Sequence, residues 1–173
     1  MARHAINPHR LAEPRWDAPE LAWTEAVRRG DQLPLHRALP GYAPSPLRDL
    51  PGLARELGLG RVLVKDESDR FGIQAFKGLG ASHAMDTVLR QRWRALTGED
   101  LAPGASADPG VRDRLGQVTF CAATDGNHGR AVAWTARRLG QRAVIFMPDD
   151  TAPARIAACE GEGAEVRLIA GTF

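Results

Sequence analysis

The sequence predicts an α/β protein with a parallel sheet, and the prediction rests on the regular pattern of residues 117–170. Three apolar segments, "QVTFCAAT", "RAVIFMP" and "AEVRLIA", alternate there with two segments of helical character, "NHGRAVAWTARRLG" and "TAPARIAACEGEG". Near-continuous apolar strands are typical of parallel sheets that helices cover on both faces. In such sheets the loops at the carboxyl ends of the strands bind ligands, so functional residues are expected there.

The segments before this pattern are less regular. Prolines at positions 40, 44 and 46 keep the chain extended and exclude a continuous helix there. Residues 97–114, rich in Gly, Pro, Ala and Asp, are expected to form a mobile surface loop, and the sequence suggests no role for it. The other elements expected are a helix at 18–30, a short helix at 53–58, a buried strand at 62–64 and a helix at 75–96.

The composition excludes several classes of protein. The 173 residues include 23 basic and 21 acidic side chains scattered along the chain, so no concentrated charge favours nucleic acid as a partner. No run of 18 apolar residues indicates a membrane span, and the amino-terminal residues lack the apolar run of a signal peptide. Cys121 and Cys159 are too few for a disulfide framework and suit reduced thiols. We therefore expect a cytoplasmic protein without metal ligands.

Lysine is nearly absent from this chain. Of the 23 basic residues, Lys65 and Lys77 are the only lysines, and the others are arginines. Where Arg would serve, the chain uses Arg, so a retained lysine indicates a need for an amine that can lose its proton and attack a carbonyl. The competing explanation is chance. Lys65 is interpreted as structural, paired with a nearby carboxylate.

The turn "TDGNHG", residues 124–129, follows the first strand of the alternating pattern. Its two glycines allow a tight bend and a close approach to a ligand, and a helix beginning near Asn127 presents free N–H groups to a phosphate or carboxylate. The same residues are common in any strand-to-helix turn. Asp125 could simply cap the helix, and His128 could be a hydrogen-bonded loop residue.

Taken together, these motifs resemble a known family. The order "SPL", "KDES", "RFGIQAFKGLG" and "TDGNHGRAVAW" resembles the fold-type-II pyridoxal-phosphate enzymes, and within them the diaminopropionate ammonia-lyase family. The resemblance runs from about Leu33 to the last residue; Ser45 stands where the family usually has Thr. It implies a tryptophan synthase β-like fold, a three-layer αβα arrangement around a parallel sheet, here truncated.

The resemblance also implies roles for individual residues. Lys77 would form the Schiff base with pyridoxal 5'-phosphate and, once freed, take the substrate Cα proton. Asn127 would reach the phenolic oxygen of the cofactor, and Asp125 would be a second acid/base group facing the substrate. The residues expected to bind the substrate are Thr124, Asp125, Gly126, Asn127 and His128.

The surroundings of Lys77 in the sequence agree with this role. A Schiff-base lysine needs its charged form disfavoured by burial or by positive potential. The neighbouring apolar residues Phe71, Ile73, Phe76 and Leu79 are expected to enclose Lys77. Its place in the first turn of a helix sets it against the positive end of the helix dipole.

The implied function is elimination of ammonia from the small amino acid 2,3-diaminopropionate to give pyruvate and ammonia, in a protein that is a homodimer when full-length. Residues 1–83 would be the first part of the large cofactor-binding domain, and residues 84–173 an incomplete small β-α-β domain. The family's phosphate loop and its partner for the pyridine nitrogen lie later in the chain, so we expect an inactive amino-terminal fragment.

Two alternatives stay open. A threonine or serine dehydratase would share Lys77 and Asn127 but would not require Asp125. From a different class, a nucleotide-binding or interaction domain could keep the β-α-β scaffold without catalysis.

Overall fold

The computed structural model describes residues 32–171, so the helix expected at 18–30 lies outside the described residues. Within this range, no helix has both the length and the apolar character needed to cross a membrane. The elements, in chain order, are α2 (Leu33–Ala38), β1 (Leu47–Asp49), α3 (Pro51–Leu57), β2 (Leu63–Lys65), the 3-10 turn η2 (Arg70–Gly72), α4 (Lys77–Thr97), the 3-10 turn η3 (Ala105–Ala107), α5 (Pro109–Leu115), β3 (Thr119–Ala123), α6 (Asn127–Arg138), β4 (Arg142–Pro148), α7 (Pro153–Glu160) and β5 (Glu165–Ile169).

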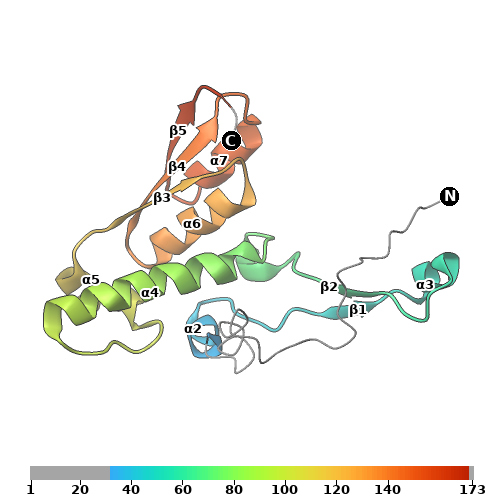
Figure 1. The fold of residues 1–173 in the computed structure, drawn as a ribbon, viewed down its shortest axis with the longest axis horizontal. Helices are drawn as coiled ribbons and strands as arrows, with labels where there is room; N and C mark the ends of the chain where they lie inside the picture. Colours follow the sequence, from blue (N-terminus) through green and yellow to red (C-terminus); the bar gives the residue numbers. More distant parts are fainter. Residues whose placement is uncertain (1–31, 172–173) are drawn as a thin grey trace, which may run out of the picture. The chain divides into compact units, whose positions relative to one another are not determined.

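The predicted β-α-β-α-β pattern forms a parallel sheet (Figure 1). β4 is the central strand, and both β3 and β5 pair with it in parallel. The register places Cys121 opposite Val144, and Phe146 opposite Arg167. The five apolar and helical segments that predicted this unit all form the expected elements, so the prediction of a parallel α/β fold is confirmed.

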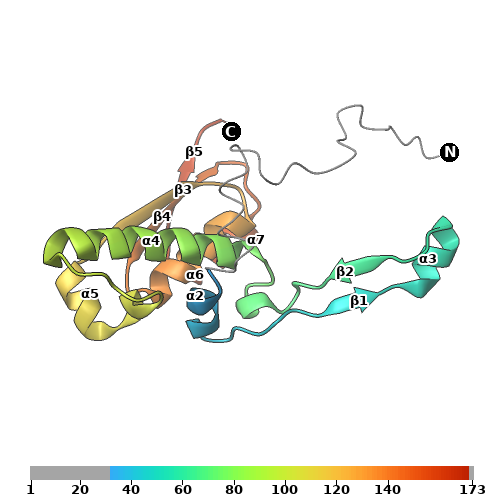
Figure 2. The ribbon, with the colours of Figure 1, turned by 60° about the horizontal axis from the view of Figure 1, so that its bottom comes forward.

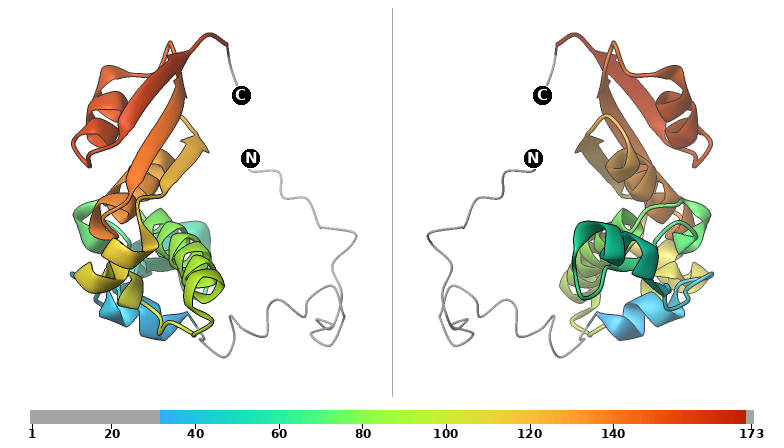
Figure 3. Two further views of the ribbon diagram at one scale, coloured as in Figure 1. Left: turned by 90° about the vertical axis from the view of Figure 1, so that its left-hand side faces the viewer. Right: turned by 90° about the vertical axis from the view of Figure 1, so that its right-hand side faces the viewer.

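Helices cover one face of this sheet within the described residues. α6 packs on β3 and β4 and also contacts α7, which packs on β5. Ala143, Ile145 and Met147 of β4 are buried in the resulting core. Figure 3 shows α7 on one side of β4 and β5, and no helix of the described chain on the other side. Cys121 and Arg167, which lie on these strands, are exposed.

The segment predicted as a buried strand at 62–64 is a strand, but it is exposed. β2 pairs antiparallel with β1 in a separate ribbon, with α3 joining the two strands (Figure 2). The side chains of Leu63 and Val64 are 46% and 43% exposed. An apolar run predicts burial, but a two-stranded ribbon leaves both of its faces open unless another element packs on it.

α4 confirms the helix predicted at 75–96 and carries much of the core. Ala81, Met85 and Leu89 are buried at intervals of four residues and therefore share one stripe of the helix, which packs against α6. The helix ends where Gly98 adopts a left-handed φ of 77°. α4 runs unbroken through residues 83 and 84, and the division of the chain there remains a prediction.

The segment expected to be a mobile loop contains regular structure. It includes η3 and α5, and the side chain of Asp108 caps α5 by accepting from the backbone N–H of Gly110 at 2.9 Å. Asp86 of α4 is 2% exposed and accepts hydrogen bonds from Ser106 Oγ at 2.5 Å and from the N–H of Gly104 at 3.3 Å. A buried carboxylate thus attaches the segment to α4, which its polar, Gly-rich composition does not indicate.

Candidate active site

Lys77 lies in the first turn of α4, as predicted; it is the first residue of the helix, and its side chain is exposed. The first N–H groups of a helix have no partner within the helix, and its dipole is positive at that end. The amine of Lys77 is therefore exposed at the positive end of the helix dipole, where a carbonyl group can reach it.

An unusual backbone precedes Lys77. Phe71 and Gln74 have left-handed φ values of 53° and 56°, although neither is glycine. Such a conformation costs roughly 1–3 kcal/mol for each residue, and it persists only where surrounding contacts enforce it. For Phe71 one such contact is clear: its ring stacks on Trp134 of α6, with 4.7 Å between ring centroids.

The expected apolar enclosure of Lys77 is not present among the described residues. Phe71 and Ile73 are 7% and 2% exposed, but both pack beneath Gly78, where an added Cβ would lie 3.1 Å from each side chain. Phe76 is 60% exposed. The ring of Phe71 packs on α6, and the side chains of Phe71 and Ile73 both pack beneath Gly78, so these residues fix the backbone that carries Lys77 rather than enclosing the lysine.

The predicted turn follows β3 directly. Thr124 extends the pairing by donating its N–H to the Phe146 carbonyl at 3.0 Å, and its Oγ1 accepts from the N–H of Gly126 at 3.3 Å. Gly126 is the N-cap of α6, which no side chain caps. The N–H groups at this helix start are thus unoccupied by a cap, as binding of a substrate carboxylate would require.

One glycine of the turn has a different role from the one predicted. Gly129 approaches protein rather than ligand, because an added Cβ would lie 2.8 Å from the γ-methyl groups of Ile145 and Thr124. The glycine lets the first turn of α6 pack closely on β3 and β4. This close packing positions the turn, so its contribution to any binding site is indirect.

Asp125 is not the helix cap that the alternative reading proposed. Its carboxylate Oδ2 accepts a hydrogen bond from Arg155 Nη1 of α7 at 3.0 Å, and its carbonyl accepts from the same nitrogen at 3.1 Å. Sequence reasoning missed Arg155. The segments that follow adjacent parallel strands meet at one edge of the sheet. A charged residue in the segment after β4 was therefore the signal that could have indicated a partner for Asp125.

The structure links the two predicted halves of the site through α4 and α6. The two helices lie side by side in Figures 1 and 2, with their first residues directed to the same side. Besides the stacking of Phe71 on Trp134, Arg130 Nη1 donates to the Ile73 carbonyl at 3.4 Å. Asn127 and His128, at the start of α6, are exposed.

A charged cluster joins the "SPL" and "KDES" motifs. Arg70 is 8% exposed and donates to Glu67 Oε2 at 2.6 Å and to the Ala43 carbonyl at 2.7 Å. Hydrogen bonds from Arg70, and also from Ser45, lower the pKa of the Glu67 carboxyl. The cluster holds the chain before β1 against the segment that leads to Lys77.

Lys65 supports this cluster. Its Nζ donates to the Ser45 carbonyl at 2.5 Å, so its partner is a backbone oxygen rather than the predicted carboxylate. The contact is consistent with the structural role predicted for this lysine.

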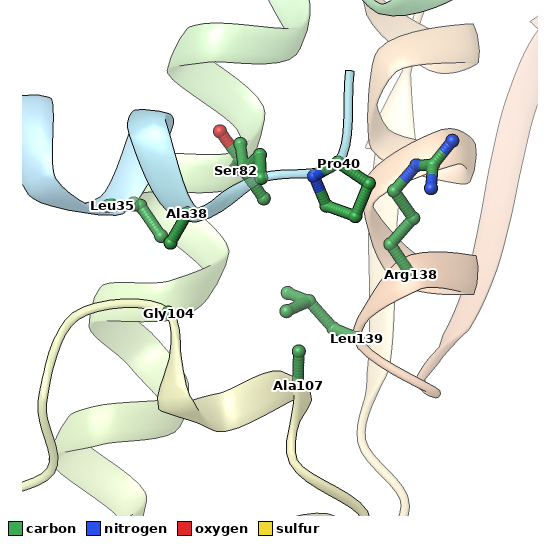
Figure 4. Close-up of a pocket in the computed structure, with 9 residues that line it drawn as sticks. Leu35, Ala38, Pro40, Ser82, Gly104, Ala107, Arg138 and Leu139 are labelled. Atoms are coloured by element: carbon green, nitrogen blue, oxygen red, sulfur yellow. The ribbon is translucent and has the colours of Figure 1, made fainter. Parts of the chain in front are cut away.

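An apolar cavity of about 150 Å³ lies elsewhere, between α2, α4, η3 and the last turn of α6. Figure 4 shows Leu139 and Ala107 pointing into it. None of its lining residues belongs to the turn or is Lys77. The cavity is therefore separate from the candidate site. In the described range, no cluster of three or more His, Cys, Asp or Glu side chains could hold a metal ion.

Three comparisons identify the relatives of this chain. Diaminopropionate ammonia-lyase of Salmonella typhimurium is 42% identical over 136 residues, covering 79% of this chain and 33% of that protein. A biosynthetic L-threonine dehydratase of Pasteurella multocida is 34% identical over 129 residues, covering 75% of this chain and 20% of that protein. The crystal structure of diaminopropionate ammonia lyase from Escherichia coli in complex with D-serine superposes with a TM-score of 0.73 at 39% identity, covering 86% of this chain and 36% of that chain.

These matches bear directly on the fold. The chain spans about a third of the length of the ammonia-lyase that it matches. The predicted fold-type-II α/β class is confirmed by the structural match and by the parallel sheet. The sequence profile described as "Pyridoxal-phosphate dependent enzyme" matches residues 38–173. The chain therefore belongs to the family of pyridoxal-phosphate dependent enzymes.

Proposed function

We propose that the intact protein is an ammonia-lyase that converts 2,3-diaminopropionate and water to pyruvate and two molecules of ammonia. The observation that carries this proposal is the placement of Asp125, which lies exposed in the turn and is not used as a helix cap. A dehydratase would not require a carboxylate here. The 42% identity to an ammonia-lyase supports the same assignment.

The residues present fit pyridoxal phosphate as the cofactor. Lys77 offers an exposed primary amine at a helix start, and Asn127 offers an exposed amide at the start of α6. Lys77 would hold the cofactor covalently, and Asn127 would contact its phenolic oxygen. When bound, the cofactor supplies an electron sink for negative charge that develops at the substrate Cα.

The protein residues would supply binding and proton transfer. The uncapped N–H groups at the start of α6 would hold the substrate carboxylate, with Thr124, Gly126 and His128 forming the edge of that site. Lys77 would take the Cα proton from one face, and Asp125 would serve the opposite face. Departure of ammonia from Cβ also needs a proton delivered to the leaving nitrogen, and either group can deliver it after taking one from Cα. Two acid/base groups on opposite faces would allow both enantiomers to react.

The test has two parts, both in the intact protein loaded with pyridoxal phosphate. Borohydride reduction followed by peptide mapping should find the modification on Lys77; modification of Lys65, or of no lysine, contradicts the assignment. Asp125→Asn should reduce kcat/KM on one enantiomer of 2,3-diaminopropionate at least about tenfold more than on the other, which is about 1.4 kcal/mol of differential barrier. Equal losses on both would remove the proposed role of Asp125. An Asp125→Asn variant that keeps nearly full activity on threonine or serine would favour a dehydratase.

We further propose that the intact protein acts as a cytoplasmic homodimer, as its family resemblance implies. Light scattering coupled to size-exclusion chromatography tests the dimer. A mass equal to one chain would contradict it.

A further inference from the structure

Arg155 contacts Asp125 from a different loop. It lies in the first turn of α7, after β4, whereas Asp125 follows β3. A single nitrogen, Arg155 Nη1, donates to the carboxylate Oδ2 at 3.0 Å and to the carbonyl of the same residue at 3.1 Å. This shared donor ties the side chain of Asp125 to its own backbone, which restricts the direction in which the carboxylate points.

The stem of Arg155 also lies over the turn. A Cβ placed on Gly126 would lie 4.0 Å from both Cδ and Nη1 of Arg155. The arginine therefore packs along the backbone of the turn as well as binding the carboxylate. Arginine suits this position because its planar guanidinium stays charged at all working pH values and offers several donors in fixed directions.

This pair contributes little to the stability of the fold. The side chains of Arg155 and Asp125 are 56% and 65% exposed, and exposed ion pairs are screened by water and salt. Stabilisation of the fold therefore does not explain why this contact is present. A role in orienting Asp125 predicts effects on the reaction instead.

We propose that Arg155 is a positioning residue that aims the Asp125 carboxylate at the substrate and thereby sets how well the protein uses one enantiomer. The proposal rests on the function proposed above, in which Asp125 serves one face of the substrate. Arg155 acts through Asp125, so its removal should affect the same enantiomer that Asp125→Asn affects. The other enantiomer, which depends on Lys77, should be affected far less.

The experiment compares Arg155→Met, Arg155→Lys, Asp125→Asn and the double variant Arg155→Met/Asp125→Asn in the intact protein loaded with pyridoxal phosphate. Arg167→Met is the matched control, because Arg167 is also 56% exposed and donates to a carboxylate, that of Glu165, at 2.7 Å. The values of kcat and KM are measured for L- and D-2,3-diaminopropionate. Crystal structures of the wild type and of Arg155→Met supply a readout that is independent of activity.

We expect Arg155→Met to lower kcat on the Asp125-dependent enantiomer about tenfold more than on the other. Arg155→Lys should restore part of this loss, and the double variant should be no worse on that enantiomer than Asp125→Asn. The Asp125 carboxylate should be displaced in the Arg155→Met structure. Arg167→Met should leave the enantiomer ratio unchanged.

Other outcomes overturn the inference. If Asp125→Asn lowers the activity on one enantiomer more than on the other, but Arg155→Met lowers the activity on both equally or on neither, the inference alone is wrong. The same holds if Arg167→Met reproduces the selectivity or if the carboxylate does not move. If Asp125→Asn itself shows no selectivity, the proposed function of Asp125 is wrong and the inference fails with it.

Discussion

Replacing Gly129 by alanine should destabilise the protein even though alanine favours helices. Gly129 lies in the first turn of α6, where the change from Gly to Ala gains at most the roughly 1 kcal/mol found in a helix interior. The new Cβ would lie 2.8 Å from the γ-methyl groups of Ile145 and Thr124, and 3.4 Å from Cys159 Sγ. Those methyl groups belong to β-branched side chains on or directly beside the sheet, so they cannot move aside easily. Overpacking of this kind costs about 1–3 kcal/mol, and two severe contacts favour the upper half of that range.

The net result is a loss of about 1–2 kcal/mol in the free energy of unfolding for Gly129→Ala. Gly80→Ala is the matched control, because Gly80 lies in α4, is exposed, and its added Cβ would meet no atom within 4 Å. That variant should gain up to about 1 kcal/mol. Denaturant unfolding of both variants in the same intact protein measures the difference. A Gly129→Ala variant as stable as Gly80→Ala would refute the packing argument.

Three further predictions concern single buried groups. Burial lowers the pKa of His36 below its ordinary value of 6.5, so the folded state favours the neutral ring. The melting temperature should therefore fall as the pH drops below 6.5, and it should fall less in the His36→Gln variant. An equal pH dependence in the two proteins would contradict this. Asp86→Ala should lower the free energy of unfolding by about 1–3 kcal/mol, because Ser106 Oγ loses its buried acceptor. It should also speed proteolysis between residues 98 and 108, and an unchanged rate of cleavage would show that the carboxylate does not hold this segment. Burial raises the pKa of the Cys159 thiol, so iodoacetamide should label the exposed Cys121 first and Cys159 only after unfolding. Equal labelling rates for the two thiols would contradict the burial of Cys159.

The sequence predicted the parallel sheet well because its determinants are local. Apolar runs of five to seven residues, separated by helical segments, leave few alternatives to β3, β4 and β5. Lys77 and the turn at 124–129 were also located correctly, since helix starts and strand ends carry short local signals. The roles assigned to them remain predictions.

The misses share a physical cause, which is contact between residues distant in the chain. The segment at 97–114 looked mobile because its composition says nothing of Asp86, to which it is bound. The predicted apolar neighbours do not enclose Lys77 within residues 32–171, because Phe71 is left-handed and its ring stacks on Trp134, which no local sequence pattern indicates. Arg155 was missed for the same reason, as its partner lies 30 residues away.

The arrangement of the sheet also has a consequence for how the chain folds. β4 pairs with the strands that directly precede and follow it in the chain, so the contacts of this sheet close shorter loops than the contact of Phe71 with Trp134 does. α4 docks on this unit by packing against α6, and Phe71, which precedes α4, stacks on Trp134, so these contacts join residues that are farther apart in the chain. We expect pulsed hydrogen exchange to protect the β4 amides before those of α4, and the reverse order would exclude this route. The turn that carries Asp125 would then form within the early unit, and Lys77 would be brought to it when α4 docks.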